Sequence, residues 1–131
     1  MLSGVVCVEI ASFGYDKGPF AKPADITLDL RRHIIATDQL PDAERFTGLH
    51  PDISGMVLES SGTRRLIDNI AKLVVNLVED EAGARLLRLR IAIGCERGVH
   101  QSPAVAEELA ATLRTAKLDI EVWHRDVPRF P

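Results

Sequence analysis

Short apolar stretches alternate along this chain with longer amphipathic ones. The short stretches are rich in β-branched residues and predict strands at 5–13, 26–30, 86–93 and 120–123. The longer stretches repeat apolar residues every three or four positions, which predicts helices at 63–80 and 102–113. Strands that alternate with helices are typical of an α/β domain whose sheet is at least partly parallel.

Turn-forming residues separate these elements. The segment 14–23 holds two glycines and two prolines and is predicted to be a loop. Residues 52–60 predict a short helix, whereas 32–51 has no clean period, and long irregular connections of this kind often carry function. Ser102 is a favourable N-cap and Pro103 a favourable first helical residue, so the last helix is predicted to begin there.

Length and composition set the scale of the domain. The chain has 131 residues, of which 46% are hydrophobic and 27% charged, so we expect one soluble globular domain spanning 1–131. About four strands in a mixed, partly parallel sheet, with flanking helices in two or three layers, fit this length. The apolar stretches are too short to span a membrane, and no signal peptide is visible.

Cysteine and charge narrow the classes of function. Cys7 and Cys95 lie far apart without metal-ligand spacing, which favours a reduced, cytoplasmic protein without a metal site. The formal net charge of −3 is a poor match to strong nonspecific binding of nucleic acid. Arginines nevertheless cluster at 31–32, 64–65 and 85–90, so RNA binding through them stays open beside an ion-paired surface.

The strongest functional pattern is IAIGCERGVHQSPAVAEELA, residues 91–110. An apolar strand ends in Gly-Cys, a short polar loop follows, and Ser-Pro opens a helix. This order directs backbone N–H groups and the positive end of a helix dipole at one point, which suits an anion such as phosphate. Ligands of α/β sheets bind beyond the carboxyl ends of strands, so residues 29–31 and 124–125, which follow other strands, are expected beside this loop.

Cys95 raises the alternative of an enzyme. Cysteine phosphatases carry Cys, five residues and then Arg, because the thiolate attacks phosphorus while the arginine binds the phosphate oxygens. The sixth residue after Cys95 is Gln101, a neutral amide, and Arg97 lies at the wrong spacing. This spacing favours a binding loop over a catalytic one. It leaves Cys95, with His100 tuning it, as the alternative catalytic pair.

The same loop resembles a known family, the C-terminal domain of the RapZ proteins, which are described as RNase adapter or nucleotide-binding proteins. The family pattern is approximately GCTGGxHRSVxxAExLA, and this chain reads GCERGVHQSPAVAEELA over 94–110. Three further segments are similar in the same order: SFGYDKGPFAKPADITLDLR at 12–31, Thr-Gly-Leu at 47–49 and His-Arg-Asp at 124–126. Several separated matches in one order are more specific than any single motif.

The resemblance implies a stand-alone version of this domain, without the P-loop kinase-like domain that full-length members carry. It also implies a pocket for an aminosugar phosphate or similar small anion, and an ability to bind small regulatory RNA. The implied ligand-binding residues are Gly94, Cys95, Glu96, Arg97, Gly98, Val99, His100, Gln101, Ser102, Asp29, Arg31, Thr47, His124 and Arg125. No cofactor is implied.

Departures from the family pattern alter the charge of the expected pocket. Gln101 stands where the family has Arg, Val99 where it often has Lys, and Arg97 replaces a glycine. Each charge-assisted hydrogen bond contributes about 1.5–3 kcal/mol, so ligand affinity is expected to depend on whether Arg97 compensates. We therefore predict a non-enzymatic sensing or adapter domain that binds a sugar-phosphate-like or nucleotide-like anion. It would signal to a protein or RNA partner and form homo-oligomers through an exposed sheet edge.

Overall fold

The computed structural model describes residues 7–32, 44–81, 88–116 and 118–128. Within these residues, four strands form one sheet in the order β2-β3-β1-β4. The strands are β1 (Cys7–Gly14), β2 (Ile26–Asp29), β3 (Arg88–Cys95) and β4 (Asp119–His124). Each neighbouring pair is parallel. The predicted α/β class is confirmed, and the described sheet, which was expected to be mixed, is parallel throughout.

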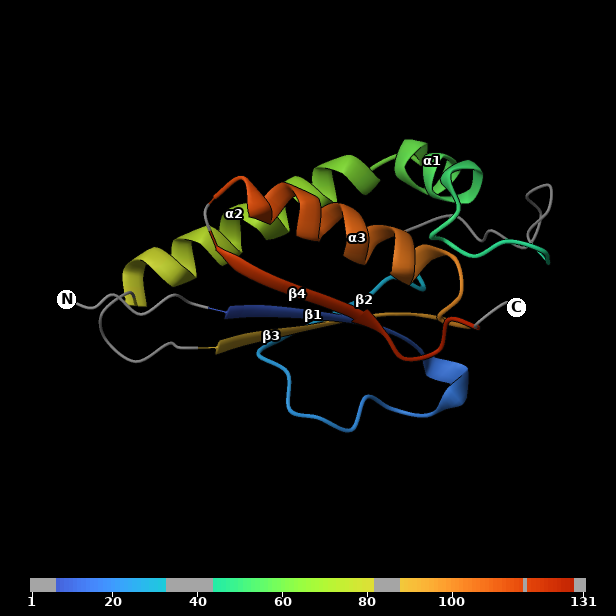
Figure 1. The fold of residues 1–131 in the computed structure, drawn as a ribbon, viewed down its shortest axis with the longest axis horizontal. Helices are drawn as coiled ribbons and strands as arrows, with labels where there is room; N and C mark the ends of the chain where they lie inside the picture. Colours follow the sequence, from blue (N-terminus) through green and yellow to red (C-terminus); the bar gives the residue numbers. More distant parts are fainter. Residues whose placement is uncertain (1–6, 33–43, 82–87, 117, 129–131) are drawn as a thin grey trace.

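The three described α-helices cover one face of the sheet. They are α1 (Pro51–Glu59), α2 (Thr63–Glu81) and α3 (Gln101–Arg114), and a short 3-10 helix, η1 (Tyr15–Lys17), directly follows β1. Figure 1 shows them on the same side, and α3 contacts β1, β3 and β4 directly. The described fold therefore has two layers. No helix among the described residues is long and apolar enough to cross a membrane.

The hydrophobic core lies between the sheet and these helices. Successive side chains of a strand point to opposite faces, so Val8 and Ile10 of β1 share the helix-covered face with Ile91 and Ile93 of β3. These four residues and Leu109 of α3 are each at most 1% exposed. Burying one such side chain contributes about 1.5–3 kcal/mol. The core thus holds β1, β3 and α3 together, and the loop after β3 joins two of them.

The opposite face of the sheet carries a buried carboxylate. Glu9 of β1 is 3% exposed. Its oxygens accept hydrogen bonds from Arg88 Nη1 at 2.7 Å, Arg90 Nε at 3.0 Å and Trp123 Nε1 at 2.8 Å. Burial alone would raise the pKa of Glu9, but these donors outweigh it and hold the pKa below its ordinary value. The segment between β1 and β2 crosses this face of the sheet (Figure 1).

Candidate functional site

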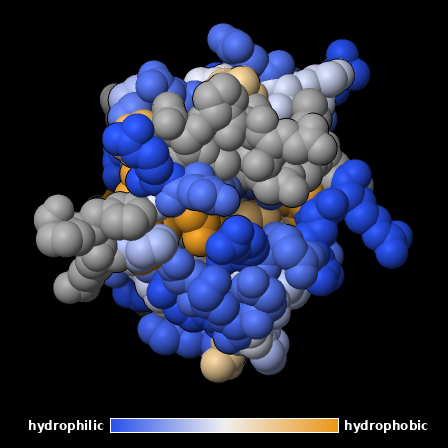
Figure 2. All heavy atoms as spheres, turned by 90° about the vertical axis from the view of Figure 1, so that its right-hand side faces the viewer, coloured by the Kyte–Doolittle hydropathy of each residue, from blue (hydrophilic) through white to orange (hydrophobic). Residues whose placement is uncertain are grey.

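The parallel sheet brings the carboxyl ends of its strands to one edge. In the register of the sheet, the neighbours at this edge are Gly14 and Cys95, Asp29 and Gly94, and Ser12 and His124. The sequence placed 29–31, 94–102 and 124–125 at a common edge, and the structure brings these segments together there. Figure 2 faces this edge and shows mainly hydrophilic side chains around a small apolar area.

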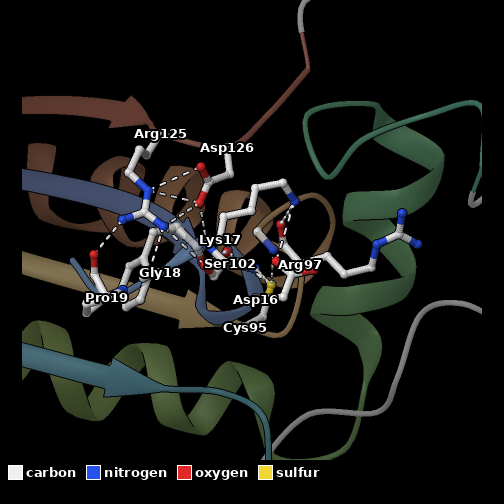
Figure 3. Close-up of polar contacts among 12 residues, drawn as sticks. Asp16, Lys17, Gly18, Pro19, Cys95, Arg97, Ser102, Arg125 and Asp126 are labelled. Atoms are coloured by element: carbon white, nitrogen blue, oxygen red, sulfur yellow. Dashed lines mark hydrogen bonds and ion pairs between the residues drawn. The ribbon is translucent and has the colours of Figure 1, made fainter.

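The loop after β3 is folded around the side chain of Cys95 (Figure 3). Cys95 is 2% exposed, and its Sγ accepts hydrogen bonds from the N–H groups of Gly98 at 3.3 Å and Ser102 at 3.4 Å. The Ser102 hydroxyl lies 3.1 Å from the same sulfur and donates to the carbonyl oxygen of Phe13 at 3.2 Å. Two backbone N–H groups that we predicted to face an anion therefore point at the sulfur atom of Cys95 inside the loop.

The start of α3 differs from the sequence prediction. The helix begins at Gln101, its N-cap residue is His100, and His100 makes no side-chain cap hydrogen bond. The predicted N-cap at Ser102 is wrong because the Ser102 hydroxyl turns inward to the sulfur of Cys95. Pro103, predicted as the first helical residue, lies within the first turn, where its missing N–H removes no helical hydrogen bond.

Close backbone contacts fix the shape of this loop. Gly98 adopts φ = +76°, in the left-handed region that favours glycine. A Cβ on Gly98 would collide with the backbone of Gly14, and a Cβ on Gly14 would collide with the backbone of Arg97. The N–H of Asp16 also donates to the carbonyl oxygen of Glu96 at 3.0 Å. The loop therefore packs directly on the residues that follow β1.

Residues that precede α1 cover another side of the loop. The N–H of Gly48 donates to the carbonyl oxygen of Val99 at 2.8 Å, and His100 Nε2 donates to that of Phe46 at 3.0 Å. Thr47 is 7% exposed, and its hydroxyl oxygen accepts a local backbone N–H at 3.1 Å. Thr47, Val99 and His100 thus lie in one region, as the sequence predicted, and the hydroxyl of Thr47 is turned to its own backbone.

Asp29 and Arg31 bind each other at the exposed rim of this edge. The guanidinium donates to the carboxylate from Nη2 at 2.7 Å and from Nε at 3.0 Å, and it stacks 3.7 Å from the ring centroid of Tyr15. The hydrogen bond from Arg31 lowers the pKa of Asp29, whereas burial raises the pKa of Tyr15. Sequence reasoning missed Tyr15, although an aromatic residue directly after a strand end was a usable signal.

His124 bridges the sheet to α3. Its Nδ1 lies 2.7 Å from Ser12 Oγ, and its Nε2 lies 2.7 Å from Glu107 Oε2. A carboxylate only accepts hydrogen bonds, so Nε2 of His124 donates to Glu107. Sequence reasoning missed Ser12 as a partner. Its signal is that it follows the buried Ile10 by two positions, so it faces the same core and, as a buried hydroxyl, needs a hydrogen bond.

Arg125 is engaged with the protein itself (Figure 3). Its Nε donates to the carboxylate of Asp126 at 3.0 Å and its Nη1 to the carbonyl oxygen of Pro19 at 2.8 Å. Its Nη2 donates to the carbonyl oxygens of Gly14 at 3.1 Å and Gly18 at 2.8 Å. Asp126 accepts the N–H of Gly14 at 2.7 Å. Burial alone would raise the pKa of Asp126, but the bonds from Arg125 and Gly14 outweigh it and lower the pKa.

Three hollows lined by described residues are found, and the largest, of about 760 Å³, lies where α1 meets α2, beside Leu58 and Arg65. A second, of about 510 Å³, runs between α2 and α3 beside Val75 and Leu113. A third, of about 320 Å³, lies on the face of the sheet opposite the α-helices, beside Glu9, Arg88 and Trp123. None of the three is lined by a residue that we predicted from the sequence to bind ligand. Within the described ranges, no three His, Cys, Asp or Glu side chains are grouped so that they could hold a metal ion.

Comparison with known proteins gives the chain a family. A model of the RapZ C-terminal domain matches residues 6–128. The chain belongs to the RapZ C-terminal domain family. It is 32% identical over 124 residues to a nucleotide-binding protein of Koribacter versatilis, and the aligned region covers 95% of this chain and 40% of that relative. It is 31% identical over 120 residues to one of Streptomyces coelicolor (92% and 40%) and 34% identical over 122 residues to one of a Mycobacterium species (92% and 39%).

The chain thus spans about 40% of the length of these relatives. Residues that carried the resemblance have structural roles in this RapZ C-terminal domain. Gly98 supplies the left-handed turn, Ser102 contacts the central sulfur, and Arg125 fastens the neighbouring segment. Two of the three loop positions that depart from the resembled pattern differ in exposure. Gln101 is 9% exposed, whereas Arg97 is exposed and its guanidinium extends away from the Arg125 cluster (Figure 3).

Proposed function

We propose that this domain binds a phosphorylated sugar or a nucleotide-like anion at the 94–102 loop and passes its bound state to a protein or RNA partner. The role is one of sensing or adaptation, without catalysis. One observation carries the proposal: the loop that leads into the N-terminus of α3 holds the exposed Arg97 at the edge of the sheet where the carboxyl ends of β1, β2 and β3 meet. A helix N-terminus beside an exposed guanidinium favours negative charge.

The electrostatics of the loop are consistent with an anionic ligand of modest charge. α3 has 14 residues, so its N-terminus carries the partial positive charge of a helix dipole. The exposed Arg97 adds a full positive charge beside it, whereas Gln101 adds none. Arg125 is held by four oxygen-bearing partners of the protein, so its cation is directed away from this role. Arg97 is therefore the cation of the 94–102 loop itself on which we expect anion affinity to depend.

The names of the relatives support the same class of ligand. Three relatives that share most of this chain are called nucleotide-binding proteins. The family match at 6–128 includes the whole 94–102 loop. A phosphate group is common to nucleotides and sugar phosphates, so one anion-binding loop serves either class.

Calorimetric titration tests this function. The protein is titrated with inorganic phosphate, glucosamine 6-phosphate and nucleoside mono- and triphosphates, and saturable binding of at least one is expected. Arg97→Ala should weaken that binding by about tenfold or more, because a charge-assisted hydrogen bond contributes about 1.5–3 kcal/mol. Arg114→Ala, at the opposite end of α3, is the matched control and should bind like the parent. Absence of heat with every ligand would contradict the proposal.

RNA binding through the arginine groups is the alternative. Several of these arginines are ion-paired: Arg31 with Asp29, Arg64 with Glu108, and both Arg88 and Arg90 with Glu9. Such pairing lowers the positive potential that a polyanion requires. Filter binding across a salt series tests the alternative, because contacts to several phosphates produce a steep loss of affinity with salt. No retention of RNA at low salt would eliminate it.

A further inference from the structure

Arg125 and Asp126 follow β4, yet their side chains hold the segment that follows β1. The Arg125 guanidinium reaches the carbonyl oxygens of Gly14, Gly18 and Pro19, all within 3.1 Å. The carboxylate of Asp126 completes the arrangement by accepting the N–H of Gly14 at 2.7 Å. Gly18 adopts φ = +99°, and this unusual backbone turn presents its carbonyl to the guanidinium. Asp126 and Arg125 thus bind the N–H and the C=O of Gly14 from the same side of the segment.

The same segment packs against the loop after β3 on its other side. The backbones of Gly14 and Gly98 approach so closely that neither residue has room for a Cβ. The N–H of Asp16 donates to the carbonyl oxygen of Glu96 at 3.0 Å, and Lys17 Nζ donates to that of Arg97 at 3.1 Å. Three successive positions of the loop therefore rest on the segment that Arg125 holds (Figure 3).

We propose that Arg125 and Asp126 are positioning residues for the 94–102 loop, holding it through the 14–19 segment without touching the ligand. The inference rests on the proposed function for its ligand-binding consequence, but its structural consequence stands without a ligand. Loss of the Arg125 guanidinium frees the carbonyl oxygens of the segment and releases Gly14 from Gly98. The loop then opens around Cys95.

The state of the Arg125 side chain separates this role from direct ligand binding. Its Nε, Nη1 and Nη2 atoms each donate to a protein oxygen, and the side chain is 24% exposed. The Asp126 side chain is 9% exposed. Replacing a residue that only contacts a ligand leaves the shape of the ligand-free loop unchanged. Replacing a positioning residue changes that shape even without a ligand.

The thiol of Cys95 reports on the ligand-free loop. The chain has two cysteines, so Cys7→Ser leaves Cys95 as the single thiol. In that background, labelling of Cys95 by a disulfide reagent is slow because the residue is 2% exposed. Arg125→Met should accelerate labelling at least tenfold while circular dichroism stays the same. The labelling rate is compared with the rate that global unfolding alone would allow, obtained from urea titration of each variant.

Two matched variants keep the result interpretable. Arg88→Met removes an arginine that binds a carboxylate on the same sheet, far from the loop, and should change Cys95 labelling less than twofold. Asp126→Asn keeps the size of the side chain and serves if Arg125→Met does not fold, with accelerated labelling again expected. Unchanged labelling in the folded Arg125 and Asp126 variants would overturn the inference. Equal acceleration by Arg88→Met, or labelling explained by global unfolding, would overturn it too.

Ligand titration then separates this inference from the proposed function. With inorganic phosphate and nucleotides as probes, Arg125→Met should weaken any binding seen with the parent by about tenfold. If the parent binds none of the probes, the proposed function fails while the labelling result still decides the positioning role. If labelling is accelerated but affinity is unchanged, the segment holds the loop shut without shaping its ligand contacts, and the ligand-binding part of the inference is wrong.

Discussion

Gly14 and Gly98 exclude each other's side chains, because the backbone at the end of β1 crosses the backbone of the 94–102 loop in direct contact. The two residues lie at the meeting point of segments far apart in sequence. A single methyl group at either position pushes those segments apart. The contact therefore links the stability of the sheet edge to the shape of the candidate ligand loop.

Gly98→Ala tests this link. Alanine at φ = +76° costs about 1–2 kcal/mol for the left-handed backbone alone, and the collision with Gly14 adds to it. Gly55→Ala in α1 is the matched control, because a Cβ there meets nothing within 4 Å. Urea unfolding should show Gly98→Ala destabilised and Gly55→Ala stabilised by about 0.5–1 kcal/mol. Full ligand affinity in Gly98→Ala would show that the loop tolerates another shape.

Gln101→Arg tests the charge of the loop. The pattern that the loop resembles has arginine at this position, and Gln101, the first residue of α3, is 9% exposed. A charge-assisted hydrogen bond of about 1.5–3 kcal/mol corresponds to roughly ten- to a hundredfold tighter binding of a phosphate. Calorimetry with inorganic phosphate measures the change, and Gln101→Lys distinguishes point charge from the planar guanidinium. Equal affinity in all three proteins would place the phosphate elsewhere.

Cys95→Ser tests the enzymatic alternative. The sulfur has two N–H donors and a neighbouring hydroxyl but lacks an arginine at the sixth position, so we expect no hydrolysis of an aryl phosphate by the parent. Ligand binding should persist in Cys95→Ser, because the serine oxygen also accepts the N–H bonds of Gly98 and Ser102. Turnover by the parent that Cys95→Ser abolishes would establish the alternative instead.

Glu9 makes the sheet sensitive to acid. Its pKa in the fold lies below the ordinary value of 4.5, so its stabilising effect is complete above that value and is lost as the pH falls through the lower, folded pKa. Glu9→Gln should lower the free energy of unfolding at neutral pH by about 1–3 kcal/mol, because buried donors lose a charged acceptor. It should also flatten the decline below pH ~5. Urea titrations from pH 7 to 2.5 measure both, with the exposed Glu121→Gln as control.

Hydrophobic periodicity predicted the described elements well, since strands and helices appear where the apolar patterns place them. It did not predict the start of α3, because whether Ser102 caps the helix or turns to Cys95 depends on the sulfur that β3 places beneath it. A partly parallel sheet was expected, but strand direction at each edge depends on connections that carry no local sequence signal.

The candidate site was predictable at the level of segments and not of contacts. Strand ends at Asp29, Cys95 and His124 were expected to meet, and in a parallel sheet they do. The backbone acceptors of Arg125 were not predictable, because they belong to a loop more than one hundred residues earlier in the chain. Gly18, for example, precedes Arg125 by 107 residues. Every residue carries a backbone carbonyl, so the sequence does not indicate which carbonyl a given arginine will bind.

The strand order β2-β3-β1-β4 places the first strand between two that are made much later. β1 pairs with β4 across a separation of 112 residues, as the contact between Ser12 and His124 records. On the ribosome, β1 therefore leaves the exit tunnel long before β3 or β4 is synthesised, and its backbone hydrogen-bonding groups are unpaired until then. Pairings of such high contact order are slow to form. The 94–102 loop packs on Gly14, so its folded shape depends on the pairing of β1 with β3 across this long separation in sequence.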